Sequence, residues 1–103
     1  MNLQDFTRGW IIGNFEPSII KTTELEIGIL DLKAGDKGDL HWHEHHKEWN
    51  LILSGAAKIG KNLYFEGDVF IFEPFEKSNV EYMQDTKLLV IKSPAMKGDK
   101  YYA

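Results

Sequence analysis

Six short runs rich in aliphatic, β-branched and aromatic residues recur along the chain, and turn residues separate them. The separators carry glycine, asparagine, aspartate and proline, which favour reversals of chain direction. Many short runs at this spacing are typical of an all-β sandwich or small barrel, and none is long enough for more than a turn or two of helix. The sequence therefore predicts an all-β fold with strands over residues 25–32, 48–53, 56–59, 69–72, 80–83 and 87–92.

The apolar pattern also predicts how some segments are buried. Apolar residues alternate over residues 25–29, which is typical of a strand with one face in the core. Residues 69–72 are apolar throughout, so we expect that strand to be buried on both faces. The two ends, residues 5–18 and 93–103, are expected to lie as extended arms over the barrel. Within the second arm, residues 97–100 are expected to form a surface tail.

The composition limits the size and the partners of the protein. A chain of 103 residues can form one domain around a single core. Its 12 basic and 16 acidic residues give a formal net charge of -4 without any basic cluster, which argues against nucleic-acid binding. No apolar run is long enough to span a bilayer and the first residues do not resemble a signal peptide, so we expect a cytoplasmic protein without a membrane partner. The absence of cysteine excludes disulfides and thiolate metal ligands.

All four histidines of the chain fall within one stretch, DLHWHEHHKEWN, at residues 39–50. In a strand, side chains two positions apart share a face, with Cα atoms about 6.6 Å apart at a rise of roughly 3.3 Å per residue. His41 and His43 can therefore direct two imidazoles toward one point. Glu48 opens the next strand and can bring a carboxylate beside them. These three residues are the predicted metal ligands.

The polar residues 44–47 between the two strands suit a hairpin turn. His45 and His46 are therefore expected at the turn, near the metal site and outside it. A solvated turn whose histidines are merely polar is the alternative interpretation of the whole stretch. The concentration of every histidine in one short window favours the metal site.

Two imidazoles and one carboxylate on one side of an ion leave other coordination positions open. That set suits a divalent transition metal such as Fe, Mn, Zn or Ni, and the sequence does not select among them. By alternation Asn50 shares the face of Glu48, where it could contact a bound ligand. A hydrogen-bonded structural role for Asn50 is an equal alternative.

The spacing of five residues, Gly35, His41, His43, Glu48 and Gly55, resembles the first motif of the cupin superfamily without a gap. The resemblance covers most of residues 25–92. It implies a cupin-type jelly roll (a double-stranded β-helix) formed by a single domain over residues 1–103, with a metal in the mouth of a conical barrel. The glycines also make independent sense, since both lie where turns need a permissive backbone.

The second cupin motif is where the chain departs from the family pattern. That motif supplies one more histidine ligand, and counting from Gly67 places Ser78 at the histidine position. Strand phase directs Ser78 and Tyr82 to one inward face, where Tyr82 fits best as part of the core. Asn79 would reach the site only through a β-bulge. The final histidine ligand of the family is therefore missing, and either Ser78 or Asn79 stands in its place.

Two classes of function fit these features. The first is a metal-dependent enzyme acting on a small polar substrate, and the cupin resemblance admits sugar isomerases, epimerases and dioxygenases. The second is a non-catalytic module that binds a small molecule, with or without a metal. We therefore expect a metal-binding cupin that binds a small polar ligand, and the sequence does not assign its reaction. A homodimer is also expected, because a chain of this size buries little surface, and the resemblance implies the same assembly.

Overall fold

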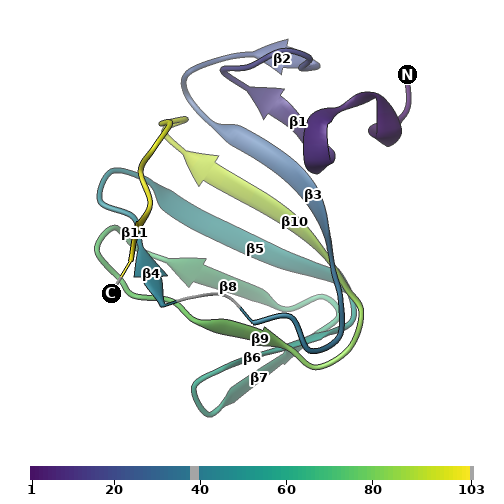
Figure 1. The fold of residues 1–103 in the computed structure, drawn as a ribbon, viewed down its shortest axis with the longest axis vertical. Coiled ribbons are helices and arrows are strands. Elements are labelled where there is room, and N and C mark those ends of the chain that lie inside the picture. Colours follow the sequence, from purple (N-terminus) through teal and green to yellow (C-terminus); the bar gives the residue numbers. More distant parts are fainter. Residues whose placement is uncertain (38–39, 103) are drawn as a thin grey trace.

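The computed structural model describes residues 1–37 and 40–102, and it consists mainly of short strands (Figure 1). No helix among these residues is long and apolar enough to cross a membrane. In chain order the elements are the 3-10 helices η1 (Leu3–Asp5) and η2 (Thr7–Gly9), then β1 (Trp10–Gly13), β2 (Ile20–Lys21), β3 (Glu26–Leu32), β4 (His41–Trp42), β5 (Lys47–Ser54), β6 (Ala56–Ile59), β7 (Asn62–Phe65), β8 (Val69–Phe72), β9 (Val80–Tyr82), β10 (Thr86–Ser93) and β11 (Tyr101–Tyr102).

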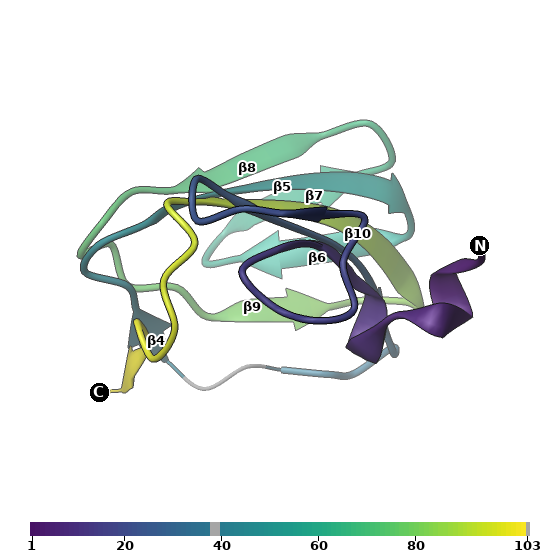
Figure 2. The ribbon, with the colours of Figure 1, turned by 90° about the horizontal axis from the view of Figure 1, so that it is seen from above.

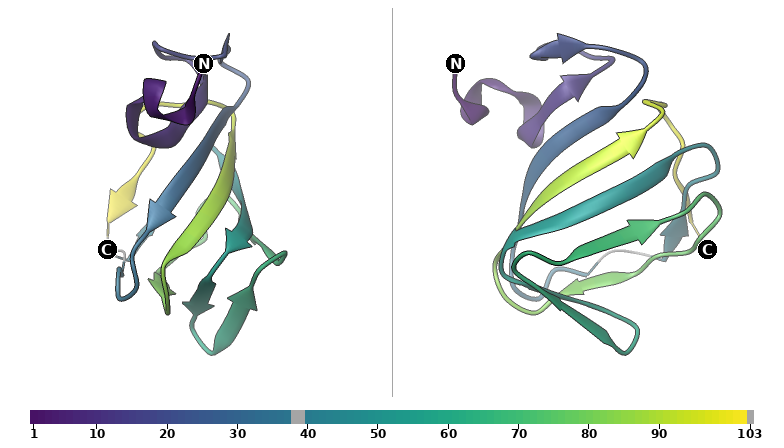
Figure 3. Two further views of the ribbon diagram at one scale, coloured as in Figure 1. Left: turned by 90° about the vertical axis from the view of Figure 1, so that its right-hand side faces the viewer. Right: turned by 180° about the vertical axis from the view of Figure 1, so that it is seen from behind.

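The strands form three sheets arranged in two facing layers. The largest has the order β2-β1-β3-β10-β5-β8, and all its pairs except β1 with β2 are antiparallel. The sheets β7-β6-β9 and β11-β4 are antiparallel, and β9 and β4 lie opposite β5 and β8 (Figure 2). The hairpin β6–β7 projects beyond the large sheet (Figure 3). The sheets are not closed into a barrel by continuous strand pairing, so the layers form an open double-stranded β-helix.

The prediction of an all-β chain is confirmed, and each of the six predicted runs contains a strand, β3, β5, β6, β8, β9 and β10. The sequence prediction missed β1, β2, β7 and β11. Three of these are strands of two to four residues near the ends of the chain, within or just after the segments expected to be extended arms. The fourth, β7, begins at Asn62, directly after the two residues that follow β6.

The expectation that residues 69–72 are buried on both faces is wrong. β8 is an edge strand of the large sheet, and its side chains alternate. Phe70 and Phe72 point into the core, whereas Val69 and Ile71 are 52% and 42% exposed. A wholly apolar run therefore marks here an edge strand whose outer face is apolar and exposed.

The inner face of the large sheet changes from polar at one end to apolar at the other. Glu48 of β5 pairs in register with Lys92 of β10, and four residues further along the same strands Ile52 pairs with Leu88. The apolar end forms the core, while the polar end remains open between the layers. The buried core residues are Ile52, Ala57, Phe70, Phe72, Leu88 and Val90.

Gly55 shows why the first motif needs glycine at its end. Its φ of 104° lies in the left-handed region that residues with a Cβ rarely adopt. A Cβ at this position would also lie 2.4 Å from the Thr86 side-chain oxygen and 2.6 Å from the Asp85 carbonyl. Gly55 therefore allows β5 to turn into β6 while passing close against the start of β10. Gly35 likewise has a positive φ of 88°, as a turn glycine should.

Candidate metal centre

Two adjoining cavities open at the polar end between the layers, with volumes of about 330 Å³ and 270 Å³. Four residues, His41, Glu48, Asn50 and Tyr82, line both of them. Ser78 lines the first and His43 the second. The structure thus places six of the seven sequence-predicted residues around one connected space, and Asn79 lies outside both cavities.

The ring of His43 is held in one orientation by the backbone. Its Nδ1 contacts the carbonyl oxygen of Asp99. A carbonyl can only accept, so Nδ1 carries the proton and Nε2 keeps its lone pair. Nε2 lies 3.7 Å from Oε1 of Glu48, and the His43 side chain is buried. An imidazole that donates one N–H to a backbone carbonyl and offers the other nitrogen is the usual arrangement of a metal-ligating histidine.

Burial keeps this imidazole neutral. Removal from water lowers the pKa of His43, while the hydrogen bond to Asp99 and the charge of Glu48 raise it in part. The net direction is downward, so His43 is uncharged at neutral pH. A neutral imidazole is the form that binds a metal ion.

His41 is joined to Ser78 through both backbone and side chain. The two residues exchange backbone hydrogen bonds of 3.1 Å and 2.7 Å across the mouth. The Ser78 hydroxyl lies 3.3 Å from Nε2 of His41, and Ser78 is 3% exposed. Ser78 therefore occupies the inward position that a second-motif histidine would take. Asn79 has a buried side-chain oxygen that has no hydrogen-bond partner among the described residues.

Glu48 has an amide donor and a cation as close neighbours. The Asn50 amide donates to Oε2 at 3.2 Å, and the Lys92 ammonium lies 3.8 Å from Oε1. Tyr82 stands in the same space, and burial together with the charges of Glu48 and Asp36 raises its pKa to about 12. Tyr82 is therefore a protonated hydroxyl at any physiological pH and is available as a donor to a ligand.

Asp99 is buried, with 4% of its surface exposed, so the expectation of a surface tail over residues 97–100 is wrong for this residue. Its carboxylate accepts hydrogen bonds from the backbone N–H groups of Glu44, His45 and His46 at 2.9–3.0 Å, and from His45 Nδ1 at 3.0 Å. Burial alone would raise the pKa of Asp99, but these hydrogen bonds outweigh it and lower the pKa to about 2. Successive backbone N–H groups that converge in this way form an anion-binding concavity.

Residues 99–102 form a C-terminal strap across the histidine segment. β11 pairs antiparallel with β4, and the rings of Tyr101 and Trp42 stack at 5.9 Å. The strap places the carbonyl of Asp99 on His43, so the end of the described chain orients a predicted metal ligand. This role for Asp99 was missed in the sequence, where no local pattern distinguishes the residue.

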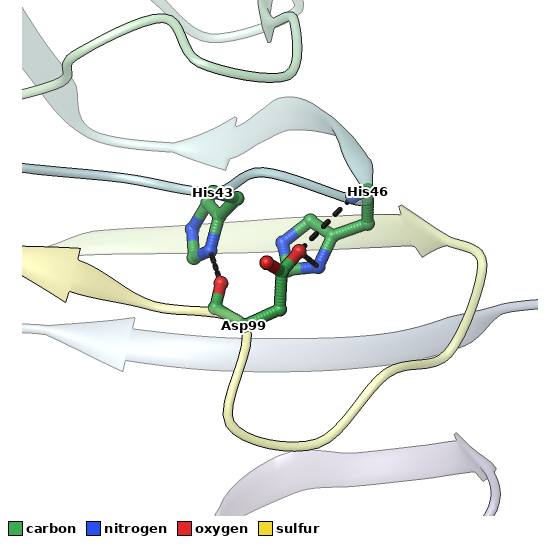
Figure 4. A group of neighbouring side chains, drawn as sticks. All are labelled: His43, His46 and Asp99. Atoms are coloured by element: carbon green, nitrogen blue, oxygen red, sulfur yellow. Dashed lines mark hydrogen bonds and ion pairs between the residues drawn. The ribbon is translucent and has the colours of Figure 1, made fainter.

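His46 does not lie in an exposed turn as expected. It is 3% exposed, and its ring centroid lies 4.0 Å from that of His43 (Figure 4). His46 directly precedes β5, and residues 46, 48 and 50 follow the alternation of its inner face, a periodicity in the sequence that could have identified the burial. His45, one position earlier, has a side chain that is 53% exposed, in agreement with the turn expectation.

The nitrogens of His46 are poorly satisfied. Nδ1 lies 3.0 Å from Oδ2 of Asp99, an ion-pair distance, but neither ring nitrogen makes a hydrogen bond of acceptable direction with the described residues. Burial, and then the neighbouring His43 and Lys92, lower the pKa of His46 to about 4. The ring is therefore neutral at pH 7, and its contact with the carboxylate is not a charged pair.

One set of possible ligand atoms converges within 4.8 Å among the described residues, and it consists of His43, His46 and Asp99. The predicted set of His41, His43 and Glu48 lies around the cavities but is more open. In the predicted set, the rings of His41 and His43 lie edge to face, with centroids 5.3 Å apart. The two sets share His43, which makes this residue the centre of either arrangement.

Comparison with solved structures identifies the architecture. A double-stranded β-helix protein from Klebsiella pneumoniae superposes with a TM-score of 0.75 at 14% identity, over 100% of this chain and 89% of the other. An RmlC-like cupin from Shewanella frigidimarina gives 0.66 at 20% identity, over 74% and 71%. This chain has the cupin fold. No family model and no curated protein matches the sequence.

A third cupin-fold neighbour is a metalloenzyme. Oxalate decarboxylase from Bacillus subtilis, which has Mn(II) centres, superposes with a TM-score of 0.68 at 20% identity. The match covers 79% of this chain and 24% of the enzyme, so this cupin-fold chain corresponds to about a quarter of that protein. At this identity the likeness concerns the fold alone.

Proposed function

We propose that this chain is a metal-binding cupin that holds one divalent transition metal ion between His41, His43 and Glu48. The observation that carries the proposal is the fixed ring of His43. Its Nδ1 is bound to the Asp99 carbonyl, while its Nε2 lone pair lies 3.7 Å from the Glu48 carboxylate beside the cavities. The ion would supply Lewis acidity toward a ligand in its open positions. The Mn(II) centres of the oxalate decarboxylase neighbour support metal binding by this fold.

The converged set of His43, His46 and Asp99 is less suited to hold the ion. Both oxygens of Asp99 already accept hydrogen bonds, four in all, from the turn over residues 44–46. A metal at Asp99 would compete with these bonds for the same lone pairs and loosen the turn. His43 would also have to release the Asp99 carbonyl if it coordinated through Nδ1. The low pKa of Asp99 is explained by the turn alone.

The cavities fit a small polar ligand beside the ion. Their combined lining mixes the hydroxyls of Ser78 and Tyr82 and the amide of Asn50 with the apolar rings of Phe70 and Phe72. Volumes of about 330 Å³ and 270 Å³ lie at the lower end of the range for small-molecule sites. With Ser78 in place of a fourth ligand, water or the ligand itself would complete the coordination sphere.

A second candidate function is metal-free binding of a small molecule at the same place. The observation that favours it is the Lys92 ammonium, which lies 3.8 Å from Glu48 and can neutralise this carboxylate without a metal. The same cavities would then serve a non-catalytic binding module. Metal content separates the two candidates.

Elemental analysis of protein purified without added metal tests the proposal directly. We expect about one transition-metal ion per chain, or uptake of one ion after the protein is incubated with Mn, Fe, Ni or Zn salts. Affinity should fall as the pH drops below about 6, because protons then compete for the imidazole nitrogens. Protein that takes up none of these ions at pH 7.5 would establish the metal-free alternative.

We also propose that the protein forms a homodimer through the outer face of the large sheet. That face is hollowed by an apolar cavity of about 520 Å³, lined mainly by Leu25, Trp49, Leu51, Val69, Leu89 and Ile91. A sheet that is apolar on both faces needs a second layer over its outer face, which residues 1–37 and 40–102 do not supply. Light scattering at micromolar concentration should give twice the chain mass. Val69→Glu should shift the protein to a monomer, and a wild-type monomer would contradict the proposal.

A further inference from the structure

We propose that the ligand of this site is a small anion, a carboxylic acid of a few carbon atoms, and that Lys92 binds its carboxylate. This inference rests on the proposed function, since it assigns the class of ligand that the metal-binding cavity takes. Lys92 is on the inner face of β10, directly opposite Glu48 on β5. Its side chain is 22% exposed and lines the 270 Å³ cavity together with His41, His43 and Glu48.

The charges around the cavity carry the argument. A bound divalent ion brings two positive charges to His41, His43 and Glu48, whereas Glu48 contributes one negative charge. Lys92 adds a positive charge 3.8 Å from Glu48, and Lys100 lines the same cavity. Positive charges gathered around one partly desolvated cavity repel one another. An anion lying between the ion and the ammonium removes this repulsion, and a neutral ligand does not.

Among the residues that line the 270 Å³ cavity, Glu48 is the one acid, beside the two cations Lys92 and Lys100. Glu26 is opposite Lys92 on β3 and lines a second cavity with it, but it does not line the cavity of the metal ligands. The Lys92 ammonium lies 5.0 Å from the Trp10 ring centre, a cation–π contact that holds the side chain in place without neutralising it. Asp99, the remaining buried carboxylate near this end, is bound to the turn over residues 44–46.

The geometry also limits the size of the acid. A cavity of about 270 Å³ with Lys92 at one side and the metal ligands at another holds a molecule of a few carbon atoms. A hydroxyl or second carboxylate on such an acid would reach an open position on the ion. The protonated hydroxyl of Tyr82, whose side chain lines the same cavity, would donate a further hydrogen bond.

Calorimetric titration of the metal-loaded protein with lactate and malonate, each compared with its amide, tests the inference. We expect each acid to bind at least tenfold more tightly than lactamide or malonamide, which have nearly the same shape without the charge. Lys92→Met should lower acid affinity at least tenfold and leave amide binding unchanged. Lys87→Met is the matched control, because Lys87 is on the same strand, is exposed and pairs with Asp31.

The outcomes separate this inference from the proposed function. Metal content is measured on every variant, so loss of acid binding with retained metal supports the role of Lys92. Equal binding of acids and amides by the wild-type protein would overturn the inference while metal binding stands. Acid affinity that is the same in Lys92→Met and in the wild type would overturn it as well. Failure to load metal would instead refute the proposed function.

Discussion

Replacing His43 with alanine is expected to abolish metal binding, with an affinity loss greater than about 100-fold at pH 7.5, since even supporting residues beyond the ligands typically change affinity by 10–100-fold. His43 is the residue whose free nitrogen faces Glu48, and its ring is held in place by the C-terminal strap. His41→Ala should have a comparable effect, because only Glu48 and one imidazole would then remain. Competition with a chromophoric chelator measures the affinities, and circular dichroism shows whether each variant is folded.

His45→Ala is the matched control for these substitutions. Its side chain is 53% exposed and contacts Asp99 rather than the cavities, so metal affinity should stay within about threefold of the wild type. Equal losses in the His41, His43 and His45 variants would point to a diffuse surface chelate and would refute the assigned ligands. Retention of metal by His43→Ala would refute the central role of His43.

The protein should lose stability to unfolding as the pH falls from 6.5 to about 4, and His46 should contribute a large part of the loss. The pKa of His46 is lowered from 6.5 to about 4 in the folded chain, chiefly by burial. Between these two values the unfolded chain binds a proton that the folded chain does not, so the free energy of unfolding falls as the pH falls. A shift of this size corresponds to about 3 kcal/mol, a large share of a typical small-domain stability.

His46→Phe should flatten this dependence while leaving stability at pH 7 nearly unchanged, because phenylalanine fills a similar volume and carries no unsatisfied nitrogen. Urea unfolding at pH 7, 5.5 and 4, with a chelator present to remove any metal, measures the effect. His45→Ala serves again as the control and should retain the wild-type slope. The carboxylate of Asp99, with a pKa of about 2, should contribute a separate loss only below pH 4. If the stability of His46→Phe fell with decreasing pH as steeply as that of the wild type, the assignment of this loss to His46 would be refuted.

The large central strands could be predicted because their signal is local. Runs such as 87–92 combine β-branched and aliphatic residues over enough positions to identify β10, and the adjoining runs identify β3 and β5. The runs in β1 and β11 are only three and two residues long, and these strands are defined by their pairing with β3 and β4. Burial of an edge strand such as β8 depends on its position in the sheet, which the apolar pattern does not encode.

The same distinction applies to the site. His41, His43 and Glu48 could be singled out because they lie close together in the sequence, and all three line the adjoining cavities. The expected pairing of their two strands is wrong, because β4 pairs with β11 while β5 belongs to the large sheet. The alternation of β5 would also have predicted an inward side chain for His46. The polar residues around it favoured a turn instead, and the burial was missed. Asp99 could not be predicted, since its hydrogen-bond partners lie 53–56 residues away and nothing in the run around it marks an anchor. Contacts of that separation are visible only in three dimensions.

The C-terminal strap has a consequence for the order of events during biosynthesis. His43 is translated 56 residues before Asp99, whose carbonyl selects its tautomer. β3 and β5 both pair with β10, so the large sheet can assemble only after β10 is made, and the strap follows β10 in the chain. Metal added to a chain that stops before Asp99 would meet an imidazole that can rotate freely. The metal centre should therefore be completed only after the strands of the large sheet have been made.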